Sequence, residues 1–319
     1  MFYNKKHVLV TGGTGFIGRH FVEALLAQDA FVLVPLHERP LPIEFAGRVE
    51  VVTADLSKQE DCLKLMQGVD YVFHAAGAVA AAAVTTSNPM AAITANLILT
   101  SQILQAAWTA KVDRVLIFSS STGYPAFTHP VKEEEMWSGP THPTYFGYGW
   151  MRRYLERLGE YVTSKSTVKV AIARPSAVYG CHDNFNPKTS HVIPSLIRRA
   201  VVKENPFVVW GTGDDVRDSL HVTDLVTGCL LLLEKRPNAD PINIAYGKGY
   251  SIKETIELIL KAAGHDKVDV RFDATKPSTI PFRMMDTTKA KSLLGFEPSI
   301  SFEEGLRDTV AWFSSRTDK

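Results

Sequence analysis

The sequence predicts an α/β fold in which a doubly wound parallel sheet carries a smaller carboxyl-terminal domain. Short apolar runs rich in Val, Ile and Phe alternate with longer segments of helical period over residues 7–175. Such alternation is typical of parallel strands joined by helices that cover both faces. A glycine-rich turn follows the first run, and the alternation fades after Gly180. A chain of 319 residues is long enough for a large core and a second domain.

The expected elements follow one another in a regular order. The strands are HVLV, FVLV, VEVV, YVFHAA, RVLIFSS and VKVAIARP, with helices near 19–28, 58–67, 90–110 and 148–163. Beyond Gly180 we expect a helix near 193–203, a short strand at PFVVW and a helix near 251–263. The first domain should span 1–180, with contributions from about 205–245, and the second mainly 181–319. The second domain would lie on the carboxyl ends of the strands, where such sheets bind ligands.

The composition narrows the class of protein. Acidic and basic residues nearly cancel, to a formal net charge of +1. The net charge therefore gives no reason to expect binding to nucleic acid or to an anionic membrane. Cys62, Cys181 and Cys229 show neither metal-ligand spacing nor a disulfide framework, which suits a reducing cytoplasm. Glycines interrupt the apolar start before it could serve as a signal core. We expect a cytoplasmic protein with no metal, nucleic-acid partner or membrane association.

The turn VLVTGGTGFIGRH carries three glycines in the spacing GxxGxxG. Gly12 permits a tight turn, Gly15 lets the backbone approach a pyrophosphate, and Gly18 lets the following helix pack close to the strand. The amino end of that helix favours the anion. Glycines often only mark turns, but a strand before and a helix after favour dinucleotide binding.

The choice of dinucleotide depends on the end of the second strand, FVLVPLHERP. An acidic side chain there binds ribose hydroxyls, and an arginine binds a 2'-phosphate. Glu38 favours NAD(H), whereas His37 and Arg39 favour NADP(H). Because two basic residues stand against one acidic residue, we expect NADP(H). The alternative is a solvated charged turn.

Several motifs together resemble a known family. VTGGTGFIG, ADL, HAAG, ITANLILT, SSS before TGYP and ARPSAVYG resemble, in order and spacing, the extended short-chain dehydrogenases of the nucleotide-sugar epimerase and dehydratase group. HDNFNPKTSHVIPSLI and KPSTIPFRMMDTTKAKSLLGFEP are similar to segments of the GDP-L-fucose synthase family within it. The resemblance implies a Rossmann domain that binds NADPH, a GDP-sugar in the smaller domain, and a homodimer formed through helices near 90–110 and 148–163. It places cofactor contacts at Gly12, Gly15, Phe16, Ile17, Gly18, Arg39, Asp55, Leu56, Ala75, Ala76, Asn96, Tyr148, Arg152, Pro175 and Val178.

Hydride transfer at a sugar carbon needs a group that exchanges a proton with the sugar oxygen. Tyr148 is the candidate, because Tyr148, Arg152 and Glu156 repeat a Y, K, E spacing that the family shows. A cation nearby lowers the pKa of a tyrosine, and a partner four residues along a helix is within reach. Arginine stays protonated, so a proton relay through lysine would be lost. The alternative for Tyr148 is aromatic packing on a dimer helix.

The same resemblance assigns a serine and an epimerisation pair. Ser120 matches the serine that binds the reacting oxygen. His191 matches the histidine that acts with a cysteine to invert carbons beside the ketone, but the cysteine position holds Thr122, a poor acid. Two-base epimerisation is therefore doubtful, and His191 is equally well a structural or substrate-binding residue. A rescue role for Cys181 is conceivable.

A sugar nucleotide carries a diphosphate, which forked arginine donors bind well. Arg217 and Arg283 match the diphosphate arginines of the family, and Asn184 would face the substrate. The first hypothesis is an NAD(P)-dependent enzyme that reduces C4 of an NDP-hexose, most plausibly a GDP-4-keto-6-deoxy sugar. The alternatives are an NAD-dependent NDP-sugar 4-epimerase and a non-catalytic dinucleotide sensor. Replacing Arg152 with lysine should keep or raise activity if arginine simply stands in for lysine.

Overall fold

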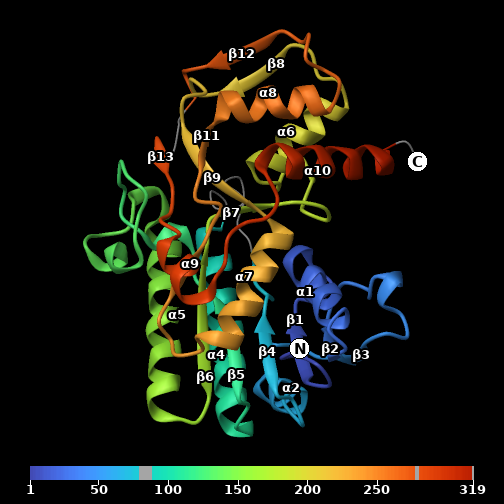
Figure 1. Cartoon of the computed structure of the whole chain (residues 1–319), viewed down its shortest axis with the longest axis vertical. Helices are drawn as coiled ribbons and strands as arrows, with labels where there is room; N and C mark the ends of the chain where they lie inside the picture. The colour runs from blue at the N-terminus through green and yellow to red at the C-terminus, as the bar shows by residue number, and fades with distance from the viewer. Residues whose placement is uncertain (79–87, 277–279, 318–319) are drawn as a thin grey trace.

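The computed structural model describes residues 1–78, 88–276 and 280–317. Its large sheet has seven parallel strands in the order β10-β6-β5-β4-β1-β2-β3 (Figure 1). The order reverses between β1 and β4, which is the switch point where doubly wound sheets bind ligands. The strands are β1 (His7–Thr11), β2 (Phe31–Leu36), β3 (Glu50–Thr53), β4 (Tyr71–His74), β5 (Arg114–Phe118), β6 (Lys169–Pro175) and β10 (Ile242–Ile244).

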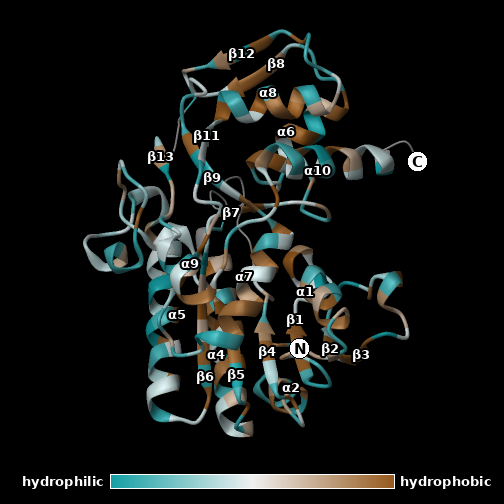
Figure 2. Ribbon diagram, viewed as in Figure 1, coloured by the Kyte–Doolittle hydropathy of each residue, from teal (hydrophilic) through white to brown (hydrophobic). Residues whose placement is uncertain are grey.

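Helices cover both faces of this sheet. Val8 and Val10 of β1 face one core, with α1 and α7, while Leu9 faces the other, with α2, α4 and α5. The brown strands in Figure 2 run between these two helical layers. The helices are α1 (Phe16–Leu26), α2 (Gln59–Leu65), α4 (Pro89–Ala110), α5 (Phe146–Lys165), α7 (Val222–Lys235) and α9 (Thr288–Leu294). The expected α/β class with a doubly wound parallel sheet is confirmed.

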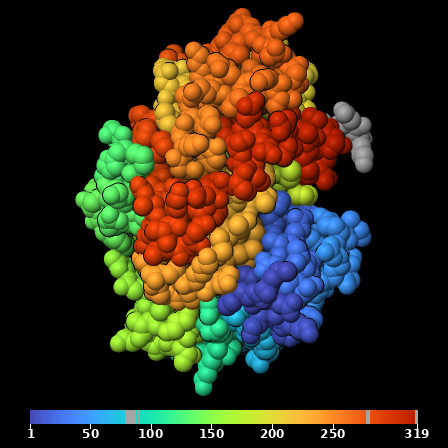
Figure 3. Space-filling view, in the orientation of Figure 1, coloured from blue at the N-terminus to red at the C-terminus, as the bar shows by residue number. Residues whose placement is uncertain are grey.

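A smaller lobe lies at one end of the large one, and late segments of the chain also cover one side of the large lobe (Figure 3). Its sheet joins β11, β9 and β13, with β7 also paired to β9, and a separate pair joins β8 and β12. Helices α6, α8 and α10 pack around a core of their own. The bounds are β7 (Ala177–Tyr179), α6 (Val192–Val201), β8 (Phe207–Trp210), β9 (Val216–His221), β11 (Gly249–Ser251), α8 (Ile252–Ala262), β12 (Val270–Asp273), β13 (Phe282–Arg283) and α10 (Phe302–Thr317).

Some boundaries differ from those that the sequence predicts. Helix α1 begins at Phe16 rather than near residue 19, because Gly15 already serves as its amino-terminal cap residue. Strands β4 and β5 end at His74 and Phe118, so the residues that follow them lie in loops at the carboxyl edge. Helix α7 packs between the sheet and α9, and it lies within 205–245, where a helical contribution to the first domain was expected without bounds.

Helix α4 is long and apolar enough, over Met90–Ala110, to cross a membrane by length and composition. Within the described part of the chain it is the only helix that meets this test. It packs against α2, α5 and β5, and core helices of soluble proteins meet the same test. The finding is therefore weak evidence for a membrane span.

Candidate active site

The glycine turn has the geometry of a pyrophosphate cradle. Gly12 has a φ of 70°, and a Cβ there would lie 2.7 Å from the nitrogen of Ala76. A Cβ on Gly18 would overlap the carbonyl of Gly12, so this glycine allows α1 to pack on the turn. A Cβ on Gly15 would meet only the Gly12 oxygen, at 3.2 Å, which leaves space beside the amino end of α1. Phe16 and Ile17 form the first turn of α1, which therefore presents free N–H groups to an anion.

A buried hydrogen-bond chain fixes the wall beside this turn. The Thr11 hydroxyl accepts a hydrogen bond from the Ala76 N–H at 3.2 Å and lies 2.8 Å from Nδ1 of His74. Nε2 of His74 lies 3.2 Å from the Thr100 hydroxyl. Burial lowers the pKa of His74 to about 3, and the positive charge of Arg152 adds to this effect. The neutral imidazole is therefore a structural support for the backbone at Ala76.

Asn96 supports the same wall from α4. Its Nδ2 donates to the carbonyl oxygens of Ala78, at 2.8 Å, and Ala92, at 2.6 Å. Its Oδ1 lies so close to Gly77 that a Cβ on that glycine would come within 2.7 Å. The predicted cofactor residue Asn96 thus holds the loop after β4, which includes Ala75 and Ala76, against α4.

The loops after β2 and β3 hold the residues predicted to meet the adenosine end. Arg39 and Glu38 are exposed, and among the described residues neither side chain forms an ion pair. Asp55 accepts hydrogen bonds from the hydroxyl and N–H of Ser57, and these lower the pKa of Asp55. Leu56 is buried under this loop. Pro175 is the last residue of β6, at the carboxyl edge of the large sheet, and Val178 lies in β7 just beyond it.

Tyr148 and Arg152 meet on the first turns of α5. Nη2 of Arg152 donates to the Tyr148 hydroxyl at 2.6 Å, and the guanidinium carbon lies 5.0 Å from the centre of the phenol ring. Nη1 of Arg152 donates to the carbonyl of Phe118, the last residue of β5, at 2.8 Å. Nε of Arg152 is buried without a hydrogen-bond partner among the described residues. The fork therefore ties the phenol to the end of β5.

Glu156, the third residue of the helical spacing, has a structural role. It forms a buried ion pair with Arg174 on β6, with nitrogen to oxygen distances of 2.8 and 2.7 Å. It also accepts a hydrogen bond from the Ser119 hydroxyl. These contacts fix α5 to β5 and β6, and they commit the Ser119 hydroxyl to a structural hydrogen bond.

Ser120 is the amino-terminal cap of the short 3-10 turn Ser121–Gly123, which contains Thr122 and lies beside α5. The Ser120 hydroxyl accepts hydrogen bonds from the N–H of Thr122 at 3.2 Å and from its hydroxyl at 3.0 Å. A Cβ on Gly149 would lie 2.5 Å from the Thr122 carbonyl, so this turn rests on the helix one residue after Tyr148. The structure thus brings the predicted serine and threonine next to the predicted tyrosine.

His191 and Asn184 lie farther along the chain, in the segment before α6. Desolvation lowers the pKa of His191, although the residue as a whole is exposed, so its imidazole is neutral at neutral pH. Nδ2 of Asn184 donates to the carbonyl and hydroxyl of Thr189, at 3.0 and 2.9 Å, and its Oδ1 accepts from the Asn186 N–H at 3.0 Å. Asn184 therefore organises its own loop.

Cys181 is poorly suited to replace the missing cysteine. Its carbonyl is hydrogen bonded to Nε2 of His20 on α1, at 3.0 Å. Burial raises the pKa of the Cys181 thiol, which opposes formation of the reactive thiolate.

Arg217 and Arg283 are direct neighbours on paired strands. They lie opposite each other in the register of β9 and β13. Arg217 donates to Asp215 at 3.1 Å, and the guanidinium of Arg283 stacks over the ring of Tyr145 at 4.5 Å. Desolvation lowers the pKa of Arg283, and the charge of Arg217 lowers it further. Two like charges placed opposite each other are unfavourable unless an anion lies between them.

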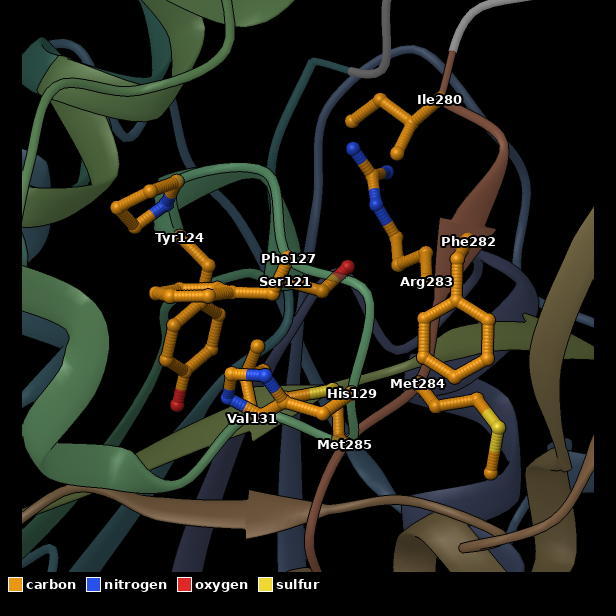
Figure 4. A pocket seen from close by; sticks show the side chains of 11 residues that line it. Ser121, Tyr124, Phe127, His129, Val131, Ile280, Phe282, Arg283, Met284 and Met285 are labelled. Atoms are coloured by element: carbon orange, nitrogen blue, oxygen red, sulfur yellow. The ribbon is translucent and has the colours of Figure 1, made fainter.

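A small cavity lies between β13 and the turn that follows Ser120. Its volume is about 10 Å³, the scale of one water molecule. Figure 4 shows Ser121 and Phe127 on one side and Phe282, Arg283 and Met284 on the other. The side chain of Arg283 and the turn after Ser120 therefore line opposite sides of this cavity.

Comparison with known proteins decides the family. Residues 8–245 match the NAD dependent epimerase/dehydratase family. The chain belongs to this family. Putative GDP-L-fucose synthase 2 of Arabidopsis thaliana is 30% identical over 311 residues, which are 96% of this chain and 91% of that protein. A dTDP-4-dehydro-6-deoxy-D-allose reductase of Streptomyces bikiniensis is 31% identical over 319 residues, 97% of each chain. The solved UDP-glucose 4-epimerase of Thermotoga maritima is 27% identical, with a TM-score of 0.87 over 98% of this chain and 100% of that chain.

Membership of this epimerase/dehydratase family confirms the predicted extended short-chain dehydrogenase with a Rossmann domain. Like its relatives, the protein is an NAD(P)-dependent enzyme that acts on nucleotide sugars. The prediction of an enzyme is confirmed, and the non-catalytic sensor is set aside.

Sequence reasoning missed two features of the site. It did not predict that the ring of Tyr145 lies under the guanidinium of Arg283. It also missed the pairing of Glu156 with Arg174. A charged residue inside an otherwise apolar strand, such as the arginine of VKVAIARP, was the available signal, because buried charges require partners.

Proposed function

We propose that this enzyme reduces the C4 ketone of a GDP-linked 4-keto-6-deoxyhexose, with NADPH as the hydride donor. The observation that carries the proposal is the hydrogen bond from Arg152 to the Tyr148 hydroxyl, with the same guanidinium anchored on Phe118. Similarity over nearly the whole chain to proteins named GDP-L-fucose synthase and dTDP-4-dehydro-6-deoxy-D-allose reductase supports this choice of substrate.

The side chains of the site divide the chemistry among them. When bound, a reduced nicotinamide supplies the hydride that the C4 carbon accepts. Tyr148 donates its phenolic proton to the C4 oxygen, and Arg152 stabilises the phenolate that forms. The Ser120 hydroxyl orients the C4 oxygen by a hydrogen bond. Because arginine does not release its proton, Tyr148 regains its own from water rather than through Arg152.

Epimerisation beside the ketone is not part of the proposed core reaction. It would need an acid and a base on opposite faces of the sugar. Thr122 is too weak an acid, and the raised pKa of the Cys181 thiol opposes a rescue. We therefore assign Thr122, His191 and Asn184 to sugar binding.

The paired arginines on β9 and β13 would hold the diphosphate. Forked donors suit two adjacent phosphates, and an anion between Arg217 and Arg283 would relieve their repulsion. In this arrangement residues 1–180, with part of 205–245, hold the dinucleotide, and the remainder of 181–319 holds most of the sugar nucleotide.

The preference for NADP(H) rests on the loop after β2. Arg39 is exposed beside the ribose end of the cradle, and no ion pair occupies it within the described ranges. A 2'-phosphate would supply the missing anion. Replacing Arg39 with alanine should raise the KM for NADPH more than the KM for NADH.

We also propose a homodimer, in the cytoplasm, formed through α4 and α5. Large apolar side chains are exposed along both helices, and an open groove runs along the first half of α4. These side chains are Met90 and Ile98 on α4, and Trp150, Tyr154 and Tyr161 on α5. A second copy of this face would cover them. Ile98→Glu should convert dimer to monomer in light scattering, and a wild-type monomer would refute the dimer.

A 4-epimerase is the second candidate, favoured by Thr122 and by the high structural similarity to a UDP-glucose 4-epimerase. Such an enzyme regenerates its cofactor in every turnover and need not release it. Mass spectrometry of the dinucleotide freed by denaturing the purified protein separates the two candidates. Stoichiometric NAD would indicate the epimerase. An empty protein that oxidises NADPH with a GDP-, dTDP- or UDP-4-keto-6-deoxyhexose would indicate the reductase, and inertness toward all three would refute the proposal.

A further inference from the structure

The side chain of Arg283 is held by an aromatic residue at the start of the catalytic helix. The guanidinium carbon lies 4.5 Å from the ring centre of Tyr145, and the guanidinium is within hydrogen-bonding reach of the Tyr145 hydroxyl. No carboxylate within the described part of the chain forms an ion pair with Arg283. Its contact across β9 is another cation, Arg217.

This arrangement leaves Arg283 with an unusual balance of forces. The arginine is desolvated, and its neighbour Arg217 repels it. A phenol ring is a neutral partner that partly compensates a desolvated guanidinium, because its face is electron-rich and stacking fixes the plane of the fork. Among the described residues no carboxylate pairs with the fork, so the fork is suited to bind an anion.

Tyr145 is also part of the structure that carries the proton donor. It ends the 3-10 turn Pro143–Tyr145 and is the amino-terminal cap residue of α5, three residues before Tyr148. One residue thus contacts the arginine on β13 and defines the start of the helix that holds the acid. The contact joins the two lobes at the site.

We infer that Tyr145 is a positioning residue that orients Arg283 for the diphosphate of the sugar nucleotide. The inference rests on the proposed function, in which Arg283 binds that diphosphate. Tyr145 is expected to govern affinity for the nucleoside diphosphate portion of the substrate, with little direct effect on the chemical step. Ligands without a diphosphate should not depend on it.

The test measures nucleoside diphosphate binding by calorimetry with saturating NADPH. GDP, UDP and dTDP are titrated into wild type, and whichever binds most tightly is the probe. Tyr145→Leu should weaken the probe by roughly tenfold, and Tyr145→Phe, which keeps the ring, by only about twofold. The KM for the sugar nucleotide should rise in parallel, with kcat within about threefold. Phe146→Leu, an exposed aromatic residue next to it, is the matched control.

A double mutant distinguishes positioning from a general structural role. If Tyr145 acts through Arg283, adding Tyr145→Leu to Arg283→Met should cause no further loss of probe affinity. Additive losses, or a fall in kcat without a change in probe affinity, would overturn the inference. If Arg283→Met weakens the probe but Tyr145→Leu does not, the inference fails while the diphosphate site stands. If Arg283→Met has no effect, or no probe binds wild type, the diphosphate assignment itself fails.

Discussion

The phosphate turn and the proton-transfer site lie at the same edge of the large sheet but are built in different ways. In the turn, the three glycines act through the absence of a side chain, and Gly12 and Gly18 have backbone so close that no Cβ fits. At the other site, Tyr148, Arg152 and Ser120 act through side-chain hydrogen bonds that other residues could remake. At Gly12 and Gly18 the neighbouring backbone excludes any side chain. At the other site a residue can be replaced if the new side chain forms equivalent hydrogen bonds.

Arg152 illustrates the second kind of site. The family spacing has lysine there, and the arginine keeps the bond to Tyr148 while adding one to the Phe118 carbonyl. The guanidinium offers several donors in a fixed plane, so it can serve both acceptors at once.

The largest effect is expected for Tyr148→Phe, which removes the proposed proton donor and leaves the ring. We expect kcat to fall by roughly a thousandfold, because general acid catalysis contributes on this scale. Affinity for NADPH, measured by fluorescence titration, should change little, because the phosphate turn is untouched. Retention of most of the activity would show that another group donates the proton.

Changes at Arg152 should have the next largest effect. Arg152→Met removes the charge that stabilises the phenolate and should lower kcat by roughly a hundredfold. Arg152→Lys keeps the charge and should stay within about tenfold of wild type, because lysine still reaches a hydroxyl four residues away. Both variants are compared by steady-state kinetics. Loss of NADPH binding in Arg152→Lys would mean that the pocket has been rebuilt around the guanidinium.

The two regions also differ in how far the sequence predicted them. The spacing of the glycines predicted their structural roles directly, since each role depends on a backbone conformation or a close backbone approach that only glycine allows. The spacing of Tyr148 and Arg152 on one helix likewise predicted their contact. The stacking of Tyr145 on Arg283 joins residues far apart in the chain, so no local period could indicate it.

Replacing Gly15 or Gly18 with alanine tests whether these two glycines of the turn have separate roles. Gly18→Ala forces a clash with the Gly12 carbonyl and should lower the free energy of unfolding by roughly 2 kcal/mol. Gly15→Ala meets only the Gly12 oxygen, at 3.2 Å, so stability should stay close to wild type. Its affinity for NADPH should fall by roughly tenfold, because the methyl group crowds the approach to the pyrophosphate. Denaturant unfolding and NADPH titration measure the two effects, and equal behaviour of the two variants would contradict these separate roles.

The smallest expected effect concerns Asp183, beside Asn184 in the loop before α6. Its Oδ1 accepts from the Asn184 N–H at 2.6 Å, while its Oδ2 is buried without a partner among the described residues, and desolvation raises the pKa of Asp183 to about 7. Because the unfolded chain releases this proton near pH 4, ionisation favours unfolding, and stability should fall as pH rises from about 4 to about 7. Asp183→Asn keeps an oxygen acceptor and removes the charge, so its melting temperature should exceed that of wild type by roughly 2–4 °C at pH 8 and match it at pH 4. Calorimetric scans across this range measure the difference, and parallel pH profiles would show that the carboxylate is solvated in the folded protein. A positive result would show that the buried carboxyl of Asp183 lowers the stability of the loop that holds Asn184, a residue proposed to bind the sugar.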